Sequence, residues 1–321
     1  MTIKRIGILT SGGDAPGMNA AIRAVVRTAL RNNLEVMGIA RGYAGLIHEE
    51  LMLMDRRSVS NIIGRGGTIL KTARCPEFQT EEGQRQAVTT LKKHRIDGLV
   101  LIGGDGTYRG GIALSRKWGV PCIGMPGTID NDIQGTDVTI GADTAVNTAL
   151  EAIDKIRDTA TSMERIFVVE VMGRDSGFIA LQVALAGGAE DVLIPEQPFD
   201  LPGMCKEIAE GNFRGKVSWI IIVAEGAASA YDIARQITGI TALDARVAVL
   251  GHIQRGGNPT AQDRNLAGLL GVEAVNLLIR GESGKAVGVI SEKVNIVDLE
   301  YAVTPKELST KPSYQLVKTL I

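Results

Sequence analysis

Short apolar runs that end abruptly in glycine and polar residues recur along the chain, and they constrain its fold more than any other feature. The runs are apolar throughout rather than alternating, which is typical of strands covered on both faces of a sheet. Segments with helical periodicity separate them, and strands that alternate with helices predict parallel sheets with right-handed crossovers. The runs lie at residues 5–14, 98–106, 122–132, 166–177, 191–196, 219–226 and 247–257.

Two segments between the runs predict helices. Residues 19–32 carry an apolar stripe with arginines at fourfold spacing beside it, and residues 141–158 are rich in alanine and other helix formers. Residues 302–321 follow no such pattern, so we expect little regular structure there and a segment that could cross back to another domain. The alternation of strands and helices predicts an α/β protein, with a change of domain near residue 140.

Composition excludes several classes of protein. The 321 residues carry a net charge of −1 and are 45% hydrophobic, which is ordinary for a globular protein and gives no reason to expect nucleic acid or a membrane surface as a partner. No apolar stretch approaches the roughly 20 residues that span a bilayer, and the N-terminus does not read as a signal peptide. The three cysteines are widely spaced, which favours neither a disulfide framework nor a zinc site. We expect a cytoplasmic protein.

The common phosphate-binding fingerprints are absent. There is no G-x-x-x-x-G-K-[ST], and G-x-G-x-x-G is broken at "GDGTYR", where Arg109 replaces the last glycine. Glycine-rich turns nevertheless follow several apolar runs, and their exposed N–H groups suit phosphate oxygens. One such turn is more often only a tight connection between strand and helix. Three turns, each with a polar partner, favour phosphate binding.

Three aspartates follow two of the apolar runs. Asp105 lies in "GGDGT", and Asp130 and Asp132 lie in "PGTIDND", residues 126–132. If the two strands are neighbours, the three carboxylates converge. Magnesium usually takes one or two carboxylates together with water and substrate phosphates, which would leave one aspartate for proton transfer. A single aspartate here would more often be an Asx-turn or a helix cap, but the cluster favours a function.

Arginines complete this pattern, because the planar guanidinium binds phosphate through two parallel hydrogen bonds. Several lie at or near strand ends, with one histidine in "GHIQRGG". Taken singly, each is more often a solvated surface residue. Glycine-rich turns, carboxylates and arginines together indicate phosphoryl transfer. These residues are Arg74, Arg165, Arg174, Arg246, Arg255 and His252.

The motifs resemble those of the bacterial ATP-dependent 6-phosphofructokinase family from the first strand to beyond residue 270. "GGDGT" alone is shared with NAD kinases and lipid kinases, whereas "PGTIDND" with "MGR" and "GHIQRGG" is far more specific. The matching segments are "LTSGGDAPGMNA" (9–20), "RGGT" (65–68), "TARCPEF" (72–78), "IGGDGTY" (102–108), "PGTIDND", "DKIRDTA" (154–160), "VMGRDSG" (171–177), "VAEG" (223–226) and "VLGHIQRGG" (249–257).

The resemblance implies a fold and a reaction. The fold would be α/β, with two Rossmann-like parallel-sheet domains and the active site in the cleft between them. Residues 1–140 with 255–303 would form the larger, ATP-binding domain, and residues 141–254 with 304–321 the smaller, fructose 6-phosphate-binding domain. The reaction would move the γ-phosphoryl group of ATP to the 1-hydroxyl of fructose 6-phosphate.

The resemblance also implies roles for the residues of the active site. Asp130 would be the general base and Thr128 would help to place the sugar, while Asp105 and Asp132 would hold Mg²⁺. Charge on the transferred group would be stabilised by Gly13, Arg74 and Arg174. ATP would lie along Gly13, Arg74, Cys75, Gly104, Asp105, Gly106 and Thr107. Tyr43 would either border the adenine or pack in the core.

The sugar phosphate would contact two subunits, which fits a homotetramer with shared active sites. His252 and Arg255 of one subunit and Arg165 and Arg246 of a neighbour would bind the 6-phosphate. The rest of the sugar would meet Met172, Gly173, Arg174 and Glu225.

Two further expectations depend on the resemblance. Pyrophosphate-dependent relatives carry bulkier residues where this chain has Gly106 and Gly127, so ATP is the expected donor. A second site for ADP or phosphoenolpyruvate would use Arg23, Arg27, Arg56, Arg157, Glu190, Arg214 and Lys216. Val217 and Ser218 stand where relatives often have lysine and histidine, so we expect weaker effector responses.

Three alternatives remain at this stage. A related kinase could act on NAD or a lipid, since "GGDGT" is shared. A catalytically silent nucleotide sensor could keep the same fold, although Asp105, Asp130, Asp132 and Arg174 are all present. An NAD-dependent dehydrogenase is disfavoured by the missing dinucleotide fingerprint.

Overall fold

The computed structural model describes residues 3–306 and 310–320. These residues fall into two compact units, which are considered separately below. Unit 1 contains residues 3–144 and 255–306, and unit 2 contains residues 145–254 and 310–320.

Unit 1 is built on a sheet that has seven strands within the described residues, in the order β11-β10-β5-β4-β1-β2-β3. The five inner strands pair in parallel, and the two edge strands, β3 and β11, pair antiparallel with their neighbours. The strands are β1 (Arg5–Thr10), β2 (Glu35–Ile39), β3 (Leu51–Met54), β4 (Gly98–Gly103), β5 (Cys122–Pro126), β10 (Lys285–Ile290) and β11 (Lys293–Asp298).

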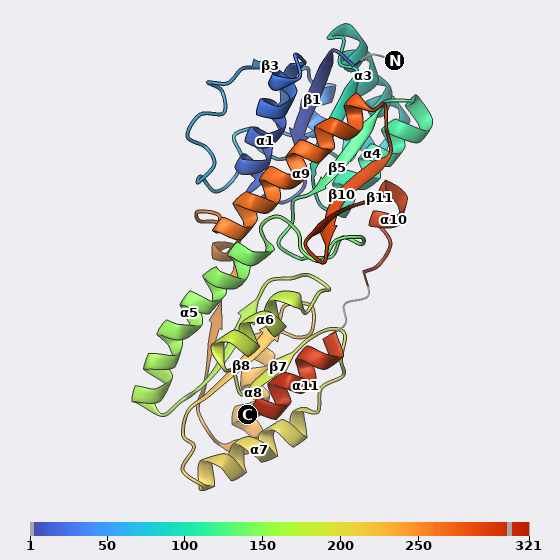
Figure 1. Ribbon diagram of the computed structural model, residues 1–321. Coiled ribbons are helices and arrows are strands. Elements are labelled where there is room, and N and C mark those ends of the chain that lie inside the picture. Colours follow the sequence, from blue (N-terminus) through green and yellow to red (C-terminus); the bar gives the residue numbers. More distant parts are fainter. Residues whose placement is uncertain (1–2, 307–309, 321) are drawn as a thin grey trace. The chain divides into compact units, whose positions relative to one another are not determined.

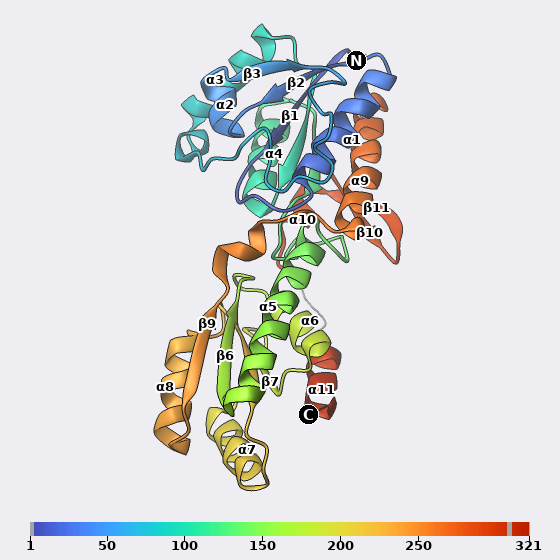
Figure 2. The ribbon, with the colours of Figure 1, turned by 90° about the vertical axis from the view of Figure 1, so that its left-hand side faces the viewer.

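Helices cover both faces of this sheet, as Figures 1 and 2 show. Two long helices, α1 and α9, pack side by side on one face, and four others cover the opposite face. Strands β4 and β5 are buried along their whole length, which explains why their sequences are apolar without alternation. The helices are α1 (Met18–Arg31), α2 (Tyr43–Ile47), α3 (Glu81–Lys93), α4 (Asp105–Trp118), α9 (Ala261–Ile279) and α10 (Leu299–Ala302), with a 3₁₀ turn at Pro76–Gln79.

Unit 2 has a four-stranded parallel sheet, in the order β7-β8-β6-β9, within the described residues. Helices α7 and α8 cover one face, while α5, α6 and α11 lie on the other (Figure 2). The strands are β6 (Ile166–Val171), β7 (Asp191–Leu193), β8 (Trp219–Ala224) and β9 (Ala245–Val249). The helices are α5 (Ala142–Met163), α6 (Phe178–Gly187), α7 (Leu201–Phe213), α8 (Ala230–Thr241) and α11 (Thr310–Leu320), with a 3₁₀ turn at Gly251–Arg255.

A buried carboxylate anchors the start of α5. Asp263 of α9 is fully buried and accepts hydrogen bonds from the Gly141 amide (2.7 Å), the Thr144 amide (2.9 Å) and the Thr144 hydroxyl (2.5 Å). Burial raises the pKa of Asp263, and these hydrogen bonds oppose the rise. The side chain thereby satisfies N–H groups that the first turn of a helix leaves without an intrahelical partner.

The structure confirms the α/β class and corrects three expectations. Two parallel sheets were expected, but the sheet of unit 1 is mixed, because its edge strands β3 and β11 pair antiparallel with β2 and β10. The run at 247–257 gives an edge strand, β9, that is only partly buried. The expectation of little regular structure in residues 302–321 was wrong: α11 packs on α6, although residues 307–309 and 321 lie outside the described part. Within the described part, no helix has the length and apolar character needed to cross a membrane.

Candidate active site

In unit 1 the ends of β4 and β5 bring two polar loops together. The strands are parallel neighbours, and Gly103 pairs with Pro126 at their carboxyl ends. The "GGDGT" turn and the "PGTIDND" loop therefore leave the sheet at the same edge. They are in close contact, because a Cβ atom on Gly104 would lie 3.7 Å from the Cβ atom of Thr128. This adjacency was predicted from the sequence on the condition that the strands were neighbours, and they are.

The "GGDGT" turn opens helix α4 and is fixed to the loop after β1. Thr107 is buried, and its hydroxyl donates to the Ser11 carbonyl over 3.0 Å. Asp105 is the first residue of α4 and forms an ion pair with Arg109 one turn later, at 3.7 Å. The first turn of a helix favours negative charge on a ligand or side chain, so this turn suits a phosphate group.

Tyr43 has a packing role in this structure. Only 5% of its surface is exposed, and its ring stacks on Phe78 with centroids 4.0 Å apart. Its hydroxyl donates to the Thr107 carbonyl over 2.5 Å, and burial raises its pKa well above the usual value. Of the two alternatives left open for Tyr43, the structure supports core packing, with the added effect of supporting the "GGDGT" turn.

The "PGTIDND" loop is held by its own hydrogen bonds. The Thr128 hydroxyl accepts from the Asp130 amide over 3.2 Å, and the Thr128 carbonyl accepts from the Thr139 hydroxyl over 2.6 Å. Asn131 has a φ of +52° and donates from its side-chain amide to the Asp137 carbonyl over 3.0 Å. Asp130 is 3% exposed, and Asp132 is partly exposed. The loop therefore keeps two carboxylates on either side of one left-handed residue.

The loop after β1 carries Gly13, with Arg255 against it. The Arg255 guanidinium donates to the Asp14 carbonyl over 2.9 Å and lies where a Cβ atom on Gly13 would be. Only glycine leaves room for this contact without movement of the arginine. Arg74 is exposed, and Cys75, which is partly buried, immediately precedes the 3₁₀ turn at Pro76–Gln79.

In unit 2, parallel neighbours β6 and β8 bring a second set of predicted residues together. The Glu225 carboxylate accepts from the Gly173 amide over 3.2 Å and from the Arg174 amide over 2.8 Å. Gly173 and Arg174 both have positive φ, at +147° and +52°. The Met172 amide donates to the Gln254 side chain over 2.9 Å. Glu225 therefore shapes the turn that presents the exposed Arg174.

Two predicted phosphate-binding arginines of unit 2 share one acidic partner. Arg246 forms an ion pair with Asp244 at 2.9 Å, and Arg165 lies 3.6 Å from the same carboxylate. Their strands are neighbours, since Phe167 of β6 pairs with Arg246 of β9. Asp244 thus brings together two cations that would otherwise repel each other. His252 lies exposed in the 3₁₀ turn after β9.

The predicted effector residues fall in both units. In unit 2 the Glu190 carboxylate lies 3.8 Å from Arg157 and 3.5 Å from Lys216, and it accepts from the Ile220 amide over 2.6 Å. Lys216 also lies over the Trp219 ring, 4.4 Å from its centroid. Arg214 pairs with Glu210 instead, at 3.5 Å. The unit 1 members are Arg23 and Arg27 on α1 and Arg56 in the loop after β3.

The donor set for a metal is small. Within the described residues, no group of three or more His, Cys, Asp or Glu side chains could hold a metal ion. Asp105 and Asp132 lie on loops that adjoin each other at Gly104 and Thr128. Two carboxylates are the number that Mg²⁺ commonly takes from a protein when phosphates and water supply the other ligands. The residues present therefore fit Mg²⁺ bound together with a nucleotide, and do not fit an all-protein metal site.

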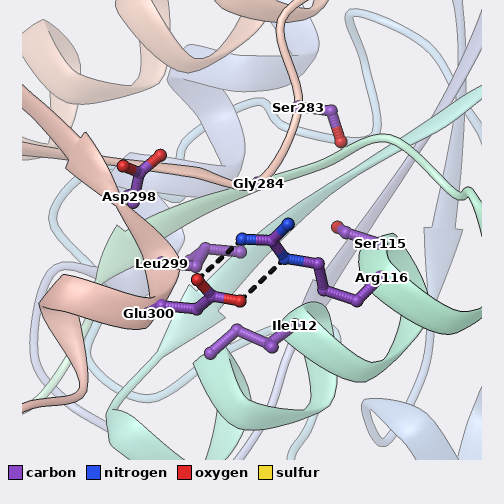
Figure 3. Close-up of a pocket in the computed structure, with 8 residues that line it drawn as sticks. All are labelled: Ile112, Ser115, Arg116, Ser283, Gly284, Asp298, Leu299 and Glu300. Carbon is purple, nitrogen blue, oxygen red and sulfur yellow. Dashed lines mark hydrogen bonds and ion pairs between the residues drawn. The ribbon is translucent and has the colours of Figure 1, made fainter.

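A surface pocket of 290 Å³ in unit 1 contains none of the predicted site residues (Figure 3). Arg116 crosses it to Glu300, with two hydrogen bonds of 2.7 Å between guanidinium and carboxylate. This ion pair occupies the guanidinium of Arg116 and the carboxylate of Glu300, two of the charged groups that line the pocket. The lining residues are Ile112, Ser115, Arg116, Ser283, Gly284, Asp298, Leu299 and Glu300.

Comparison with known proteins identifies the class and then the family. The phosphofructokinase family model matches residues 5–278. ATP-dependent 6-phosphofructokinases of Halothermothrix orenii and Bacillus mycoides are 53% and 56% identical to the chain, and each alignment covers 99% of both proteins. The structure of phosphofructokinase from Saccharomyces cerevisiae superimposes with a TM-score of 0.88 at 36% identity, over 99% of this chain and 46% of that one. The chain is a phosphotransferase. It belongs to the phosphofructokinase family.

Three residues of these loops were not found by sequence reasoning. Asn131 lies inside a motif that was recognised, but its left-handed conformation has no sequence signal stronger than the asparagine itself. Asp244 stands two residues before Arg246, and an acidic residue at that spacing could have suggested a partner. Lys306, which donates to Asn131, lies in a segment that was expected to lack structure.

Gly106 and Gly127, the two glycines because of which ATP is the expected phosphoryl donor, differ in their surroundings. This difference gives a test of the loop packing. A Cβ atom on Gly127 would lie 2.9 Å from Ile102 Cγ2 and 3.2 Å from Met18 Cε, whereas nothing lies within 4 Å of one on Gly106. We expect Gly127→Ala to lower the free energy of unfolding by about 1–3 kcal/mol through overpacking. Gly106→Ala, the matched control in helix α4, should not lower it. Denaturant titrations measure both, and equal effects would contradict the described packing.

Proposed function

We propose that the chain transfers the γ-phosphoryl group of ATP to the 1-hydroxyl of fructose 6-phosphate, giving fructose 1,6-bisphosphate and ADP, a committed step of glycolysis. The observation that carries the proposal is the contact between the "GGDGT" turn and the "PGTIDND" loop, which brings a phosphate-binding helix start beside the buried Asp130. The name shared by relatives at 53% and 56% identity supports the same reaction. An enzyme of glycolysis would act in the cytoplasm.

Proton transfer is assigned to Asp130. Its carboxylate would accept the proton of the sugar 1-hydroxyl as the oxygen attacks the γ-phosphorus atom. Its burial supports this role, as does its place two residues after Thr128, which adjoins the "GGDGT" turn. Thr128, whose hydroxyl holds the Asp130 amide, would fix the loop and place the sugar.

Charge on the transferred group requires cations and oriented donors. Asp105 and Asp132 would hold Mg²⁺, which would neutralise charge on the β- and γ-phosphates when bound. The Gly13 amide, Arg74 and Arg174 would donate to the phosphoryl oxygens. Glu225 supports Arg174 in this role, because it fixes the backbone turn from which the arginine extends. ATP itself would lie along Gly13, Arg74, Cys75, Gly104, Asp105, Gly106 and Thr107.

We assign the 6-phosphate of the sugar to residues of unit 2 and to Arg255, the first residue of unit 1 after that segment. Arg165 and Arg246, held together by Asp244, would bind the 6-phosphate in a neighbouring subunit of a homotetramer. His252 and Arg255 would bind it within the same subunit, and Met172, Gly173 and Glu225 would contact the sugar. When the 6-phosphate binds, its dianion would replace Asp244 as the ion-pair partner of Arg165 and Arg246.

The second site is proposed to bind ADP or phosphoenolpyruvate through Arg23, Arg27, Arg56, Arg157, Glu190, Arg214 and Lys216. The cluster around Glu190 supports it, because the carboxylate holds Arg157 and Lys216 close together. Val217 and Ser218 cannot supply a cation or an imidazole next to it. An effector acts only through its difference in affinity between two states, so fewer contacts should give a smaller effect.

A coupled assay of fructose 6-phosphate phosphorylation tests the proposed reaction directly. With ATP and Mg²⁺ we expect turnover, because Gly106 leaves the space next to the turn open for the rest of the nucleotide. With pyrophosphate we expect none above background, because the chain has glycine at 106 and 127, where pyrophosphate-dependent relatives carry bulkier residues. NAD and lipid acceptors serve as controls for the alternative kinases. Turnover with a different acceptor, or none with any, would overturn the proposal.

Arg246→Ala should raise the KM for fructose 6-phosphate far more than it lowers kcat, because a contact made in both ground and transition states acts on binding. The matched control is Arg235→Ala, an exposed arginine of α8 that pairs with Asp232. If the contact is made in trans, mixing Arg246→Ala with Asp130→Asn should restore some activity, since hybrids contain sites with both parts intact. No recovery in verified hybrids would count against shared sites.

Effector binding is tested by titrating ADP and phosphoenolpyruvate against fructose 6-phosphate saturation curves. Arg23→Ala should abolish any shift in half-saturation and leave the unliganded rate nearly unchanged. Arg31→Ala, on the same helix but outside the proposed set, should behave like the parent. The double variant Val217→Lys, Ser218→His should respond more strongly than the parent. A large response in the parent that Arg23→Ala leaves intact would contradict the proposed site.

A further inference from the structure

Lys306 contacts the "PGTIDND" loop from a segment far away in the sequence. Its ammonium group donates to the Asn131 carbonyl over 2.9 Å and to the Asn131 side-chain oxygen over 3.2 Å. The same segment meets the loop again, because the Gln134 amide donates to the Ala302 carbonyl over 3.1 Å. The end of α10 and the chain that follows it therefore contact residues 131–134 at two points within unit 1.

Asn131 is the residue on which the direction of both carboxylates depends. It is 1% exposed and has a φ of +52°, a conformation that residues other than glycine adopt at a cost and that asparagine tolerates better than most. Asp130 and Asp132 are its two neighbours in the chain. Any relaxation of Asn131 towards an ordinary backbone conformation would turn the peptide planes on both sides and move both carboxylates.

Two groups hold Asn131 in this conformation through three hydrogen bonds. The Asp137 carbonyl accepts from its side-chain amide over 3.0 Å, and Lys306 donates to both of its oxygens. Lys306 also lies close enough to Asp132 and Asp137 for their charges to favour its protonated form. Burial has the larger effect and lowers the pKa of Lys306 to about 8, so the group is still mainly an ammonium ion at pH 7. A charged donor bound to a buried carbonyl makes a strong contact.

We propose that Lys306 is a positioning residue for phosphoryl transfer: by holding Asn131, it fixes the directions in which Asp130 and Asp132 point. The inference rests on the function proposed above, in which these two aspartates act on the proton and the metal. Lys306 itself touches neither the sugar nor the nucleotide in this account. Its loss should therefore act on kcat rather than on binding of the sugar phosphate, since small errors in the placement of reacting groups cost about 10- to 100-fold in rate.

The test compares Lys306→Met with the parent and with Lys293→Met, an exposed lysine at the start of β11 in the same unit. We expect kcat of Lys306→Met to fall by about 10-fold or more, with KM for fructose 6-phosphate within about twofold of the parent and an unchanged secondary-structure spectrum. Lys293→Met should match the parent in kcat, in KM and in the secondary-structure spectrum. Lys306→Arg, which keeps a cation with several N–H donors, should recover a large part of the lost kcat.

Two results would overturn the inference. One is a kcat of Lys306→Met within about twofold of that of Lys293→Met. The other is a loss of thermal stability in Lys306→Met that accounts for the loss of activity, with the kcat of the folded fraction unchanged. Should Lys306→Met not fold, Lys306→Gln, which keeps a neutral donor, replaces it, and an unchanged kcat in that variant overturns the inference equally. A parent without fructose 6-phosphate kinase activity would instead refute the proposed function.

Discussion

The parallel pairing of β4 with β5 is the constraint on which the candidate site depends. Because parallel neighbours end at the same edge of a sheet, the pairing of Gly103 with Pro126 forces the two following loops into contact. The contact needs small residues: Gly104 faces Thr128, and Gly127 lies between Ile102 and Met18. A Cβ atom at Gly127 would press on both of these side chains, whereas one at Gly104 would only touch Thr128 at ordinary contact distance. The glycines of these motifs thus have a packing reason that is separate from any contact with phosphate.

Charge balance is the second organising factor. The loops of unit 1 contain carboxylates that would repel one another, and each described contact places a cation or a dipole beside them: Arg109 for Asp105, and Lys306 near Asp132. Unit 2 shows the inverse arrangement, in which the acidic groups Asp244 and Glu190 each hold two cations close together. An anion that bound at the proposed sites would find cations already gathered, because part of the cost of bringing like charges together is met before it binds.

Sequence reasoning predicted most of the central strands because buried parallel strands have continuous apolar runs, such as "WIIIVA" at β8. It missed β2 and β10, whose short buried runs each contain a glycine, and β3 and β11, whose residues are half exposed or more. It also missed α11, which is short and has Pro312 in its first turn. In the site, aspartates and arginines stood out because their chemistry is unusual at strand ends. Glu225, Tyr43 and Lys306 act through contacts with backbone groups of distant residues, and no local pattern encodes those contacts. Only the tertiary structure of each unit brings these side chains to their backbone partners.

The central claim is that neighbouring aspartates divide the chemistry, Asp130 taking the proton and Asp132 the metal. The most direct test compares Asp130→Asn with Asp132→Asn in two measurements. One is the affinity for Mn²⁺ in the presence of ATP, monitored by electron paramagnetic resonance, and the other is kcat. The account predicts that Asp130→Asn lowers kcat by roughly 10²–10⁴ with unchanged affinity for Mn²⁺, whereas Asp132→Asn weakens Mn²⁺ binding. Equal loss of metal affinity in both variants, or turnover of Asp130→Asn within about threefold of the parent, would contradict it.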